Sequence, residues 1–238
     1  MISNSGPSAE GGTFDRAWEL NRQHDVDVVD EHYYNDPQWF LANQHRYDSY
    51  DRNGPSVFVG EYASKDEKFG NALAEAAYMT GLERNADVVR MASYAPLLAR
   101  SDSVQWLPDM IWFDDQRSWG SPNYEVQKLF MTNDGDRVVP STAMDTPEFR
   151  QVVTRDEATG GLLIKVVNAQ PNPAPTRIDL GREVNPRAQV TTLQGDPEAI
   201  NTAGSQPIRP VESTFDGAAS SFTYTFPPHS ATFLRIHP

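Results

Sequence analysis

Short apolar runs that end in polar residues recur along the first half of the chain. Three runs have this form, and acidic side chains follow each: residues 26–29 before Asp30 and Glu31, 57–59 before Glu61, and 106–113 before Asp114 and Asp115. Buried parallel strands typically show this pattern, because helices cover both faces of the sheet and polar residues gather where a strand leaves it. We therefore predict parallel strands at these positions.

The segments between these runs have helical composition. Residues 37–50 and 71–99 are the two helical stretches, and Asp87 is placed to cap a second helix through residues 88–92. Alternation of strands with helices predicts βαβ units in a right-handed parallel arrangement. In an α/β barrel, the polar strand ends would line the rim that holds the active site.

The pattern changes between residues 139 and 156, after which short alternating strands replace the helices. Five such strands are predicted, at residues 162–167, 176–180, 189–193, 221–226 and 231–236. Clusters of Pro, Gly and Asn separate them, which indicates an antiparallel sandwich. We predict two domains, an α/β domain over residues 1–140 and an all-β sandwich over residues 141–238.

Charge and composition exclude several classes of partner. The net charge of -13 opposes binding to nucleic acid or to anionic membranes, both of which require surplus Lys and Arg. The absence of cysteine excludes disulfides and thiolate metal sites. No run approaches the 18 or so apolar residues of a membrane span, and residues 1–12 lack the features of a secretion signal, so we expect a cytoplasmic protein. A neutral sugar fits this composition as a ligand.

Glu61 is the leading candidate for chemistry. It follows Gly60 at the end of a β-branched run, where a rigid strand end would hold a carboxylate as tightly as nucleophilic attack requires. The preceding strand end adds carboxyls, an imidazole and two phenols at residues 30–34. Aromatic rings beside carboxylates suit a sugar, because its C–H faces pack on rings while its hydroxyls bind charged oxygens.

Several segments together resemble the α-L-arabinofuranosidases of glycoside hydrolase family 51. They occur in the order of that family and cover most of the first 140 residues: 28–34 (VVDEHYY), 47–52 (YDSYDR), 57–63 (VFVGEYA), 81–89 (GLERNADVV), 91–97 (MASYAPL), 112–114 (WFD) and 124–130 (YEVQKLF). The resemblance implies the last four βα units of a (β/α)8 barrel followed by a sandwich. It implies hydrolysis of terminal α-L-arabinofuranosyl groups in arabinan and arabinoxylan, with retention of configuration and no cofactor.

The resemblance also assigns roles to residues. Glu61 matches the family's nucleophile on the seventh strand, and Tyr33 matches a tyrosine that hydrogen-bonds it, with Tyr34 as a one-residue alternative. The family's acid/base, a glutamate after an asparagine on the fourth strand, has no match here. Residues 1–7 resemble the end of the fifth strand, so the amino-terminal half of a barrel is expected to be missing. Such a half-barrel is expected to self-associate, or to pair with a separate amino-terminal half.

Five further residues are weighed as supporting groups. Glu31 is interpreted as a structural carboxyl, or as one that orients His32 or the nucleophile. His32 is expected to hydrogen-bond rather than bind metal, since no second His or Cys lies at ligand spacing. Asp115 stands where relatives have asparagine and could touch sugar. Trp119 is either a sugar platform or packing, and Gln127 lies near the active rim or in the following helix.

Three functions remain open from the sequence. The first is an α-L-arabinofuranosidase that lacks its acid/base glutamate in this chain. The second is a non-catalytic glycan-binding or partner-dependent remnant of such an enzyme. The third is a related barrel glycosidase that uses the same two-carboxylate chemistry on xylan or glucan.

Overall fold

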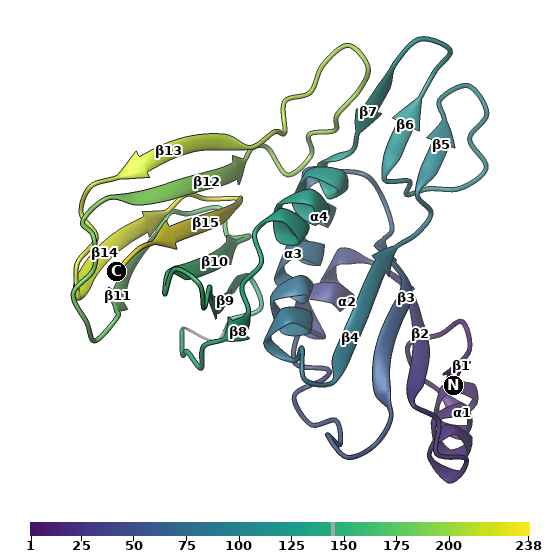
Figure 1. The fold of residues 1–238 in the computed structure, drawn as a ribbon. Helices are drawn as coiled ribbons and strands as arrows, with labels where there is room; N and C mark the ends of the chain where they lie inside the picture. Colours follow the sequence, from purple (N-terminus) through teal and green to yellow (C-terminus); the bar gives the residue numbers. More distant parts are fainter. Residues whose placement is uncertain (144–145) are drawn as a thin grey trace.

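The amino-terminal part is built on a four-stranded parallel sheet. The computed structural model describes residues 1–143 and 146–238. The sheet contains β1 (Ile2–Asn4), β2 (Val28–Asn35), β3 (Ser56–Ser64) and β4 (Val89–Tyr94), in chain order (Figure 1). All three pairings are parallel, which confirms the predicted arrangement of the first strands. The parallel sheet therefore brings the carboxyl ends of β2, β3 and β4 to one edge.

Helices cover one face of this sheet. They are α1 (Gly12–Gln23), α2 (Pro37–Ala42), α3 (Phe69–Arg84) and α4 (Pro122–Thr132). The sequence explains where α2 and α4 begin. Asp36 and Ser121 accept hydrogen bonds from backbone N–H groups in the first turn, and a proline follows each as the first helical residue. One hydrophobic cluster joins all four helices to the buried side chains of the sheet.

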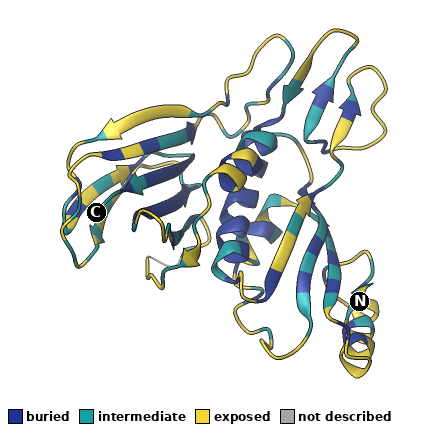
Figure 2. Cartoon of the chain, viewed as in Figure 1, coloured by how far each residue is buried: buried dark blue, intermediate teal, exposed yellow. Residues whose placement is uncertain are grey.

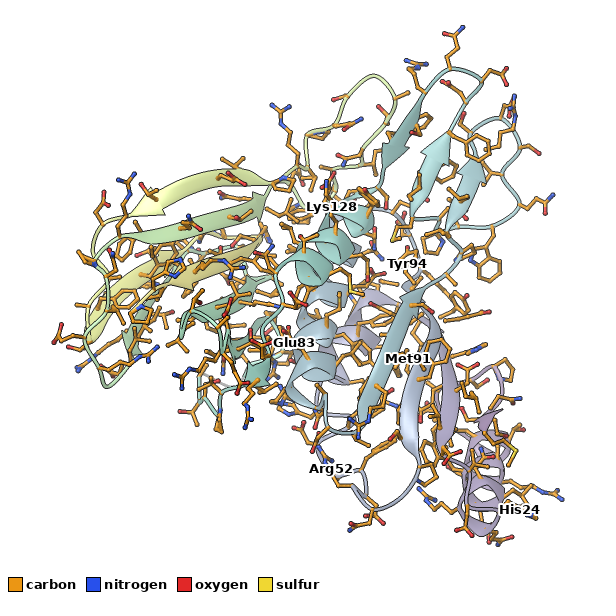
Figure 3. All side chains as sticks on the ribbon, in the orientation of Figure 1. His24, Arg52, Glu83, Met91, Tyr94 and Lys128 are labelled. Carbon is orange, nitrogen blue, oxygen red and sulfur yellow. The ribbon has the colours of Figure 1, made fainter. Side chains whose placement is uncertain are left out.

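The opposite face of the parallel sheet is partly open. Along β2, the buried residues Val29, Glu31 and Tyr33 alternate with the half-buried residues between them, as expected for a strand with one covered face. On β4, Met91 is 45 % exposed, and Figure 3 labels it on that strand. The open face therefore carries Asp30, His32 and Tyr34 from β2.

Three predicted elements differ in the structure, and the first of them, the helical stretch at 37–50, is an α-helix only as far as Ala42. Residues 87–94, expected as the start of a second helix, instead pass through a turn into β4, and the backbone N–H of Val57 donates to Val88 O at 2.8 Å. A short apolar run such as 88–92 has no periodicity that separates helix from strand, so pairing with β3 decides its conformation. The run at 106–113 is not a strand of the parallel sheet; its last three residues form β6 (Ile111–Phe113).

β6 belongs to a separate small sheet. It pairs in parallel with β5 (Leu98–Arg100) and antiparallel with β7 (Ser118–Gly120). In Figure 1 these three strands extend beyond the carboxyl end of β4, away from the rest of the parallel sheet. Pro108 lies within the run and lacks a backbone donor, which favours a loop before β6.

The carboxyl-terminal part is an antiparallel sandwich. The five predicted strands are confirmed as β10 (Leu162–Asn168), β11 (Ala174–Asp179), β12 (Ala188–Gln194), β14 (Ser221–Phe226) and β15 (Ser230–Ile236). β8 (Arg137–Val138), β9 (Phe149–Arg155) and β13 (Val211–Phe215) complete it. The larger sheet has the order β13-β12-β15-β10-β9-β8, and β11 pairs with β14.

Helix α3 lies between the parallel sheet and the sandwich. Residues of α3 contact β9, β10 and β15 on one side and β3 and β4 on the other. Nearly the whole helix is buried, as its dark colour in Figure 2 shows. Leu163 and Val167 of β10 join the helical cluster, whereas Ile164 and Val166 pack with the β11–β14 sheet. No helix in residues 1–143 or 146–238 is long and apolar enough to cross a membrane.

Candidate active site

A β-bulge at Gly60 decides which way Glu61 faces. In the pairing of β2 with β3, Glu31 lies opposite Val59 but His32 lies opposite Glu61, so Gly60 is one extra residue. Strict alternation would put Glu61 on the same face as the buried residues Val57 and Val59. One extra residue moves it to the other face. The bulge therefore presents Glu61 on the open face of the sheet.

A side chain at the position of Gly60 would displace Asp30. A Cβ atom at Gly60 would lie 2.0 Å from Asp30 Oδ1, far inside van der Waals contact. Asp30 thus occupies the space that a side chain at position 60 would need. This close approach explains why the carboxylate at position 61 follows a glycine.

Tyr34 and His32 surround one oxygen of Glu61. The Tyr34 hydroxyl donates to Glu61 Oε2 at 2.8 Å, and His32 Nδ1 lies 3.6 Å from the same oxygen. His32 Nε2 lies 3.1 Å from Asp30 Oδ2, so the imidazole stands between two carboxyl groups. Burial raises the pKa of Tyr34 well above its ordinary value, and the bond to Glu61 raises it further. Tyr34 therefore remains a donor at any working pH.

The expectation that Tyr33 bonds the nucleophile is wrong, and its one-residue alternative Tyr34 holds. Tyr33 is fully buried on the helical face, where its hydroxyl lies 2.5 Å from the Tyr47 hydroxyl and accepts a hydrogen bond from Arg46 at 3.1 Å. Successive side chains on a strand point to opposite faces, so neighbouring tyrosines have different surroundings.

Glu31 is a structural carboxyl. It is fully buried and accepts hydrogen bonds from Trp18, Tyr47 and Tyr50 at 2.8–2.9 Å. Burial raises the pKa of Glu31, although Arg46 and the three donors oppose this effect. Among its contacts with described residues, none is to His32 or to Glu61. Glu31 therefore anchors β2 to α1 and to the loop that follows α2.

The other three predicted residues contact groups other than Glu61. Asp115 forms an ion pair with Arg100 at 2.8 Å, and Trp119 lies opposite Trp112 in the pairing of β6 with β7. Gln127 is buried on α4, where its amide donates to the Tyr62 hydroxyl at 2.7 Å. The interpretation of Gln127 as part of the following helix is thus confirmed.

Sequence reasoning overlooked Trp106, and it placed Asp30 at this strand end without giving it a role. The Trp106 ring meets the Tyr34 ring edge-to-face at 5.6 Å and is 47 % exposed, so it stands beside the tyrosine that donates to Glu61. The prediction placed Trp106 in a strand, although Pro108 within the run signalled a loop. Asp30 reaches the open face because it alternates with Glu31 along β2. No cluster of three or more His, Cys, Asp or Glu that could hold a metal ion occurs among the described residues.

Comparison with known protein families identifies the family of this chain. Residues 47–230, more than half of the chain, match the model of the α-L-arabinofuranosidase C-terminal domain. The chain belongs to this family. The match begins before β3, so the α-L-arabinofuranosidase C-terminal domain model includes Glu61 and its strand together with most of the sandwich.

Individual α-L-arabinofuranosidases are similar over much of the chain. An extracellular exo-α-L-arabinofuranosidase of Streptomyces chartreusis is 36 % identical in an alignment that covers 99 % of this chain and 50 % of that protein. α-L-Arabinofuranosidase 1 of Arabidopsis thaliana is 32 % identical, over 87 % of this chain and 33 % of that protein. The chain thus spans a third to a half of the length of these relatives.

Solved structures agree on the fold. An arabinose-bound GH51 α-L-arabinofuranosidase, MgGH51, superposes with a TM-score of 0.85 at 33 % identity, over 91 % of this chain and 39 % of that one. An arabinose complex of the Thermotoga maritima α-L-arabinofuranosidase gives a TM-score of 0.74 at 16 % identity, over 93 % of this chain and 55 % of that one. The second likeness supports the fold alone.

Proposed function

We propose that this chain is part of a retaining α-L-arabinofuranosidase, and that Glu61 is its nucleophile. The substrates are terminal, non-reducing α-L-arabinofuranosyl groups of arabinoxylan or arabinan. One observation carries the proposal: the bulge at Gly60 turns a carboxylate onto the open face of the sheet, where Tyr34 holds one of its oxygens. Membership of the α-L-arabinofuranosidase family supports it.

Glu61 has the geometry of a nucleophile. Its contacts with the described residues go to Oε2, which leaves Oε1 free to attack an anomeric carbon. Attack forms a glycosyl-enzyme while a second carboxyl protonates the departing oxygen, and that carboxyl then activates water. Tyr34 keeps the attacking carboxylate in place, because its hydroxyl stays protonated.

The second carboxyl is proposed to come from polypeptide outside this sequence. Asp30, the other carboxyl at the open face, is poorly placed for the role: its Oδ1 is buried without a partner among the described residues, and its Oδ2 faces His32. We infer that residues 1–140 form the carboxyl-terminal half of a (β/α)8 barrel. In the described part of the chain, β1 and β4 each pair on one side only, which offers an edge to further strands.

A burst experiment tests the nucleophile. 2,4-Dinitrophenyl α-L-arabinofuranoside has a leaving group that needs little protonation, so the chain with Glu61 should release about one equivalent of phenolate rapidly even without a general acid. Mass spectrometry should then find one added arabinosyl group. Glu61→Ala should abolish both signals, whereas Glu10→Ala, which alters an exposed glutamate, should abolish neither.

Two outcomes would contradict this function. A burst that persists in Glu61→Ala would place the nucleophile elsewhere. A folded parent without a burst, also after addition of an amino-terminal half from a relative, would favour the alternative of a non-catalytic glycan-binding remnant. Profiling on other dinitrophenyl glycosides separates arabinosidase from xylanase or glucanase activity.

A further inference from the structure

The β-bulge at Gly60 interrupts the pairing of β3 on both of its sides. Toward β2, Gly60 is one extra residue in the pairing. Toward β4, the pairing skips Gly60 and Glu61, which face the single residue Ser93. A bulge disrupts the regular ladder of backbone hydrogen bonds around it. Glu61 therefore stands on a segment of strand whose position depends on support from side chains.

Ser93 gives this support from β4. Its hydroxyl donates to Gly60 O at 2.5 Å. That carbonyl belongs to the peptide group between Gly60 and Glu61, and a peptide group is rigid and planar, so the bond also fixes the backbone nitrogen of Glu61. The side chain of Ser93 is exposed and lies outside the buried cluster that joins the sheet to the helices. Its hydroxyl thus holds the bulge and contributes little to the core.

Asp30 supports the bulge from the other side, on β2. A Cβ atom at Gly60 would lie 2.0 Å from Asp30 Oδ1 and 2.8 Å from its Cγ, so the carboxyl group fills the space beside the glycine. Oδ1 is buried there without a partner among the described residues, which is an unfavourable position for an acceptor. Oδ2 lies 3.1 Å from His32 Nε2. Asp30 therefore packs on the bulge and orients His32 at the same time.

Both residues reach Glu61 through another group. Among the described residues, no hydrogen bond or ion pair joins Asp30 or Ser93 to Glu61 directly. Asp30 acts through His32, whose Nδ1 lies 3.6 Å from Glu61 Oε2, and Ser93 acts through the peptide group. Tyr34, in contrast, donates to the carboxylate itself. The backbone and the side chain of Glu61 are thus held by different neighbours.

We propose that Asp30 and Ser93 are positioning residues that clamp the bulge from β2 and from β4, and so fix the direction in which Glu61 attacks. The inference rests on the proposed function, because it concerns the aim of the proposed nucleophile. Nucleophilic attack needs closely defined geometry, and a displacement of about 1 Å can slow a reaction by about 100-fold. A clamp on the backbone of Glu61 therefore acts on the rate of attack.

Ser93→Ala tests the clamp by two measurements. Hydrogen exchange followed by NMR should show that the amides of Val59 and Tyr62, two buried residues that flank the bulge, exchange at least about tenfold faster than in the parent. The burst from 2,4-dinitrophenyl α-L-arabinofuranoside should be at least about tenfold slower, with its amplitude unchanged. Ser93→Thr keeps the hydroxyl on a side chain that suits a strand, so it should restore both rates.

A matched control separates the clamp from general effects on a strand. Ser213→Ala alters an exposed serine of β13 in the sandwich and should change neither the exchange at the bulge nor the burst. Urea unfolding of Ser93→Ala should occur at nearly the same concentration as in the parent, because substitutions of exposed side chains have small effects on global stability.

A double-mutant cycle tests the part of Asp30. Asp30→Ala should slow the burst at least about tenfold, since His32 loses its partner and the bulge loses its packing. Gly60→Ala alone should slow it about 100-fold, because the new Cβ displaces the Asp30 carboxyl. Added to Asp30→Ala, the same substitution should cost little more, because the space is then empty.

The outcomes separate the clamp from the proposed function. Exchange at the bulge that is unchanged in Ser93→Ala would overturn the clamp, and so would a burst as fast as in the parent. An equal cost of Gly60→Ala with and without Asp30 would overturn the part of Asp30. A folded parent that gives no burst would overturn the proposed function, and hydrogen exchange, which requires no activity, would then decide whether the clamp exists.

Discussion

Glu75 is predicted to make the stability of this protein depend on pH. It lies on α3 and is fully buried, and its Oε1 accepts a hydrogen bond from the backbone N–H of Ser64 at 2.7 Å. Its Oε2 has no partner among the described residues, and neither do the amide atoms of the nearby Asn123. Burial raises the pKa of Glu75 to about 8, although the hydrogen bond from the Ser64 N–H opposes that rise. The carboxyl is therefore neutral in the folded protein at pH 7.

The size of the effect follows from the two pKa values. In the unfolded chain Glu75 releases its proton near pH 4.5, whereas the folded protein keeps it to about pH 8. The stabilisation is thus fully present below pH 4.5 and is lost as the pH rises toward 8. Between pH 5 and pH 7 this one group should lower the free energy of unfolding by about 2.5 kcal/mol.

Urea unfolding at pH 5, 6, 7 and 8 measures this loss in the parent and in Glu75→Gln. The amide keeps an oxygen for the Ser64 N–H and cannot ionise, so the variant should be more stable than the parent at pH 7. It should also lack about 2.5 kcal/mol of the pH dependence between pH 5 and pH 7. Glu10→Gln, at an exposed glutamate, is the matched control.

The difference between parent and variant isolates Glu75 from Glu67, whose pKa burial raises to about 7 and which titrates in the same range. Parallel curves for the parent and Glu75→Gln from pH 5 to pH 8 would refute the reasoning, since they would mean that Glu75 is ionised in the folded protein.

Two further predictions concern the links within and around the site. Lys165→Met should destabilise the protein by about 3 kcal/mol in urea unfolding, because Glu83 loses the ammonium that contacts both its oxygens at 2.7 Å. Adding Glu83→Leu should recover most of this loss of stability. No recovery in the double variant would contradict the effect of a buried ion pair. Tyr34→Phe should slow the burst at Glu61 with little change in stability. Tyr33→Phe should lower the free energy of unfolding by about 1–2 kcal/mol and leave the burst intact. Equal effects of the two variants on the burst would contradict the placement of Tyr34 on the open face and Tyr33 on the helical face of the sheet.

Apolar runs predicted the first strands of this fold, and alternation predicted the later ones. The runs at 26–29 and 57–59 gave β2 and β3, and all five strands predicted after residue 161 are present. The sandwich strands can be predicted because one covered face imposes a period of two on the chain, whereas β2 and β3 were predicted from short apolar runs. The segment at 87–94 was misassigned, because too few residues separate a helical from an extended period there.

The candidate site was predicted in part. Glu61 and His32 lie together on the open face, but the choice between Tyr33 and Tyr34 needed the exact register of β2. The bulge at Gly60 arises from the register in which β2 and β3 pair, and no local sequence pattern predicts that register. Contacts between Trp106 and Tyr34 join residues 72 positions apart in the chain, so only tertiary structure could reveal them.

The position of α3 has a consequence for dividing the protein. Its apolar surface is shared between the parallel sheet and the sandwich, and Lys165 of β10 reaches Glu83 near its end, a residue labelled in Figure 3. A cut near residue 140 would leave α3 with one bare side and the sandwich with an unpaired ammonium. We expect the two halves to melt in a single cooperative transition, and truncated chains that end at such a cut to be insoluble.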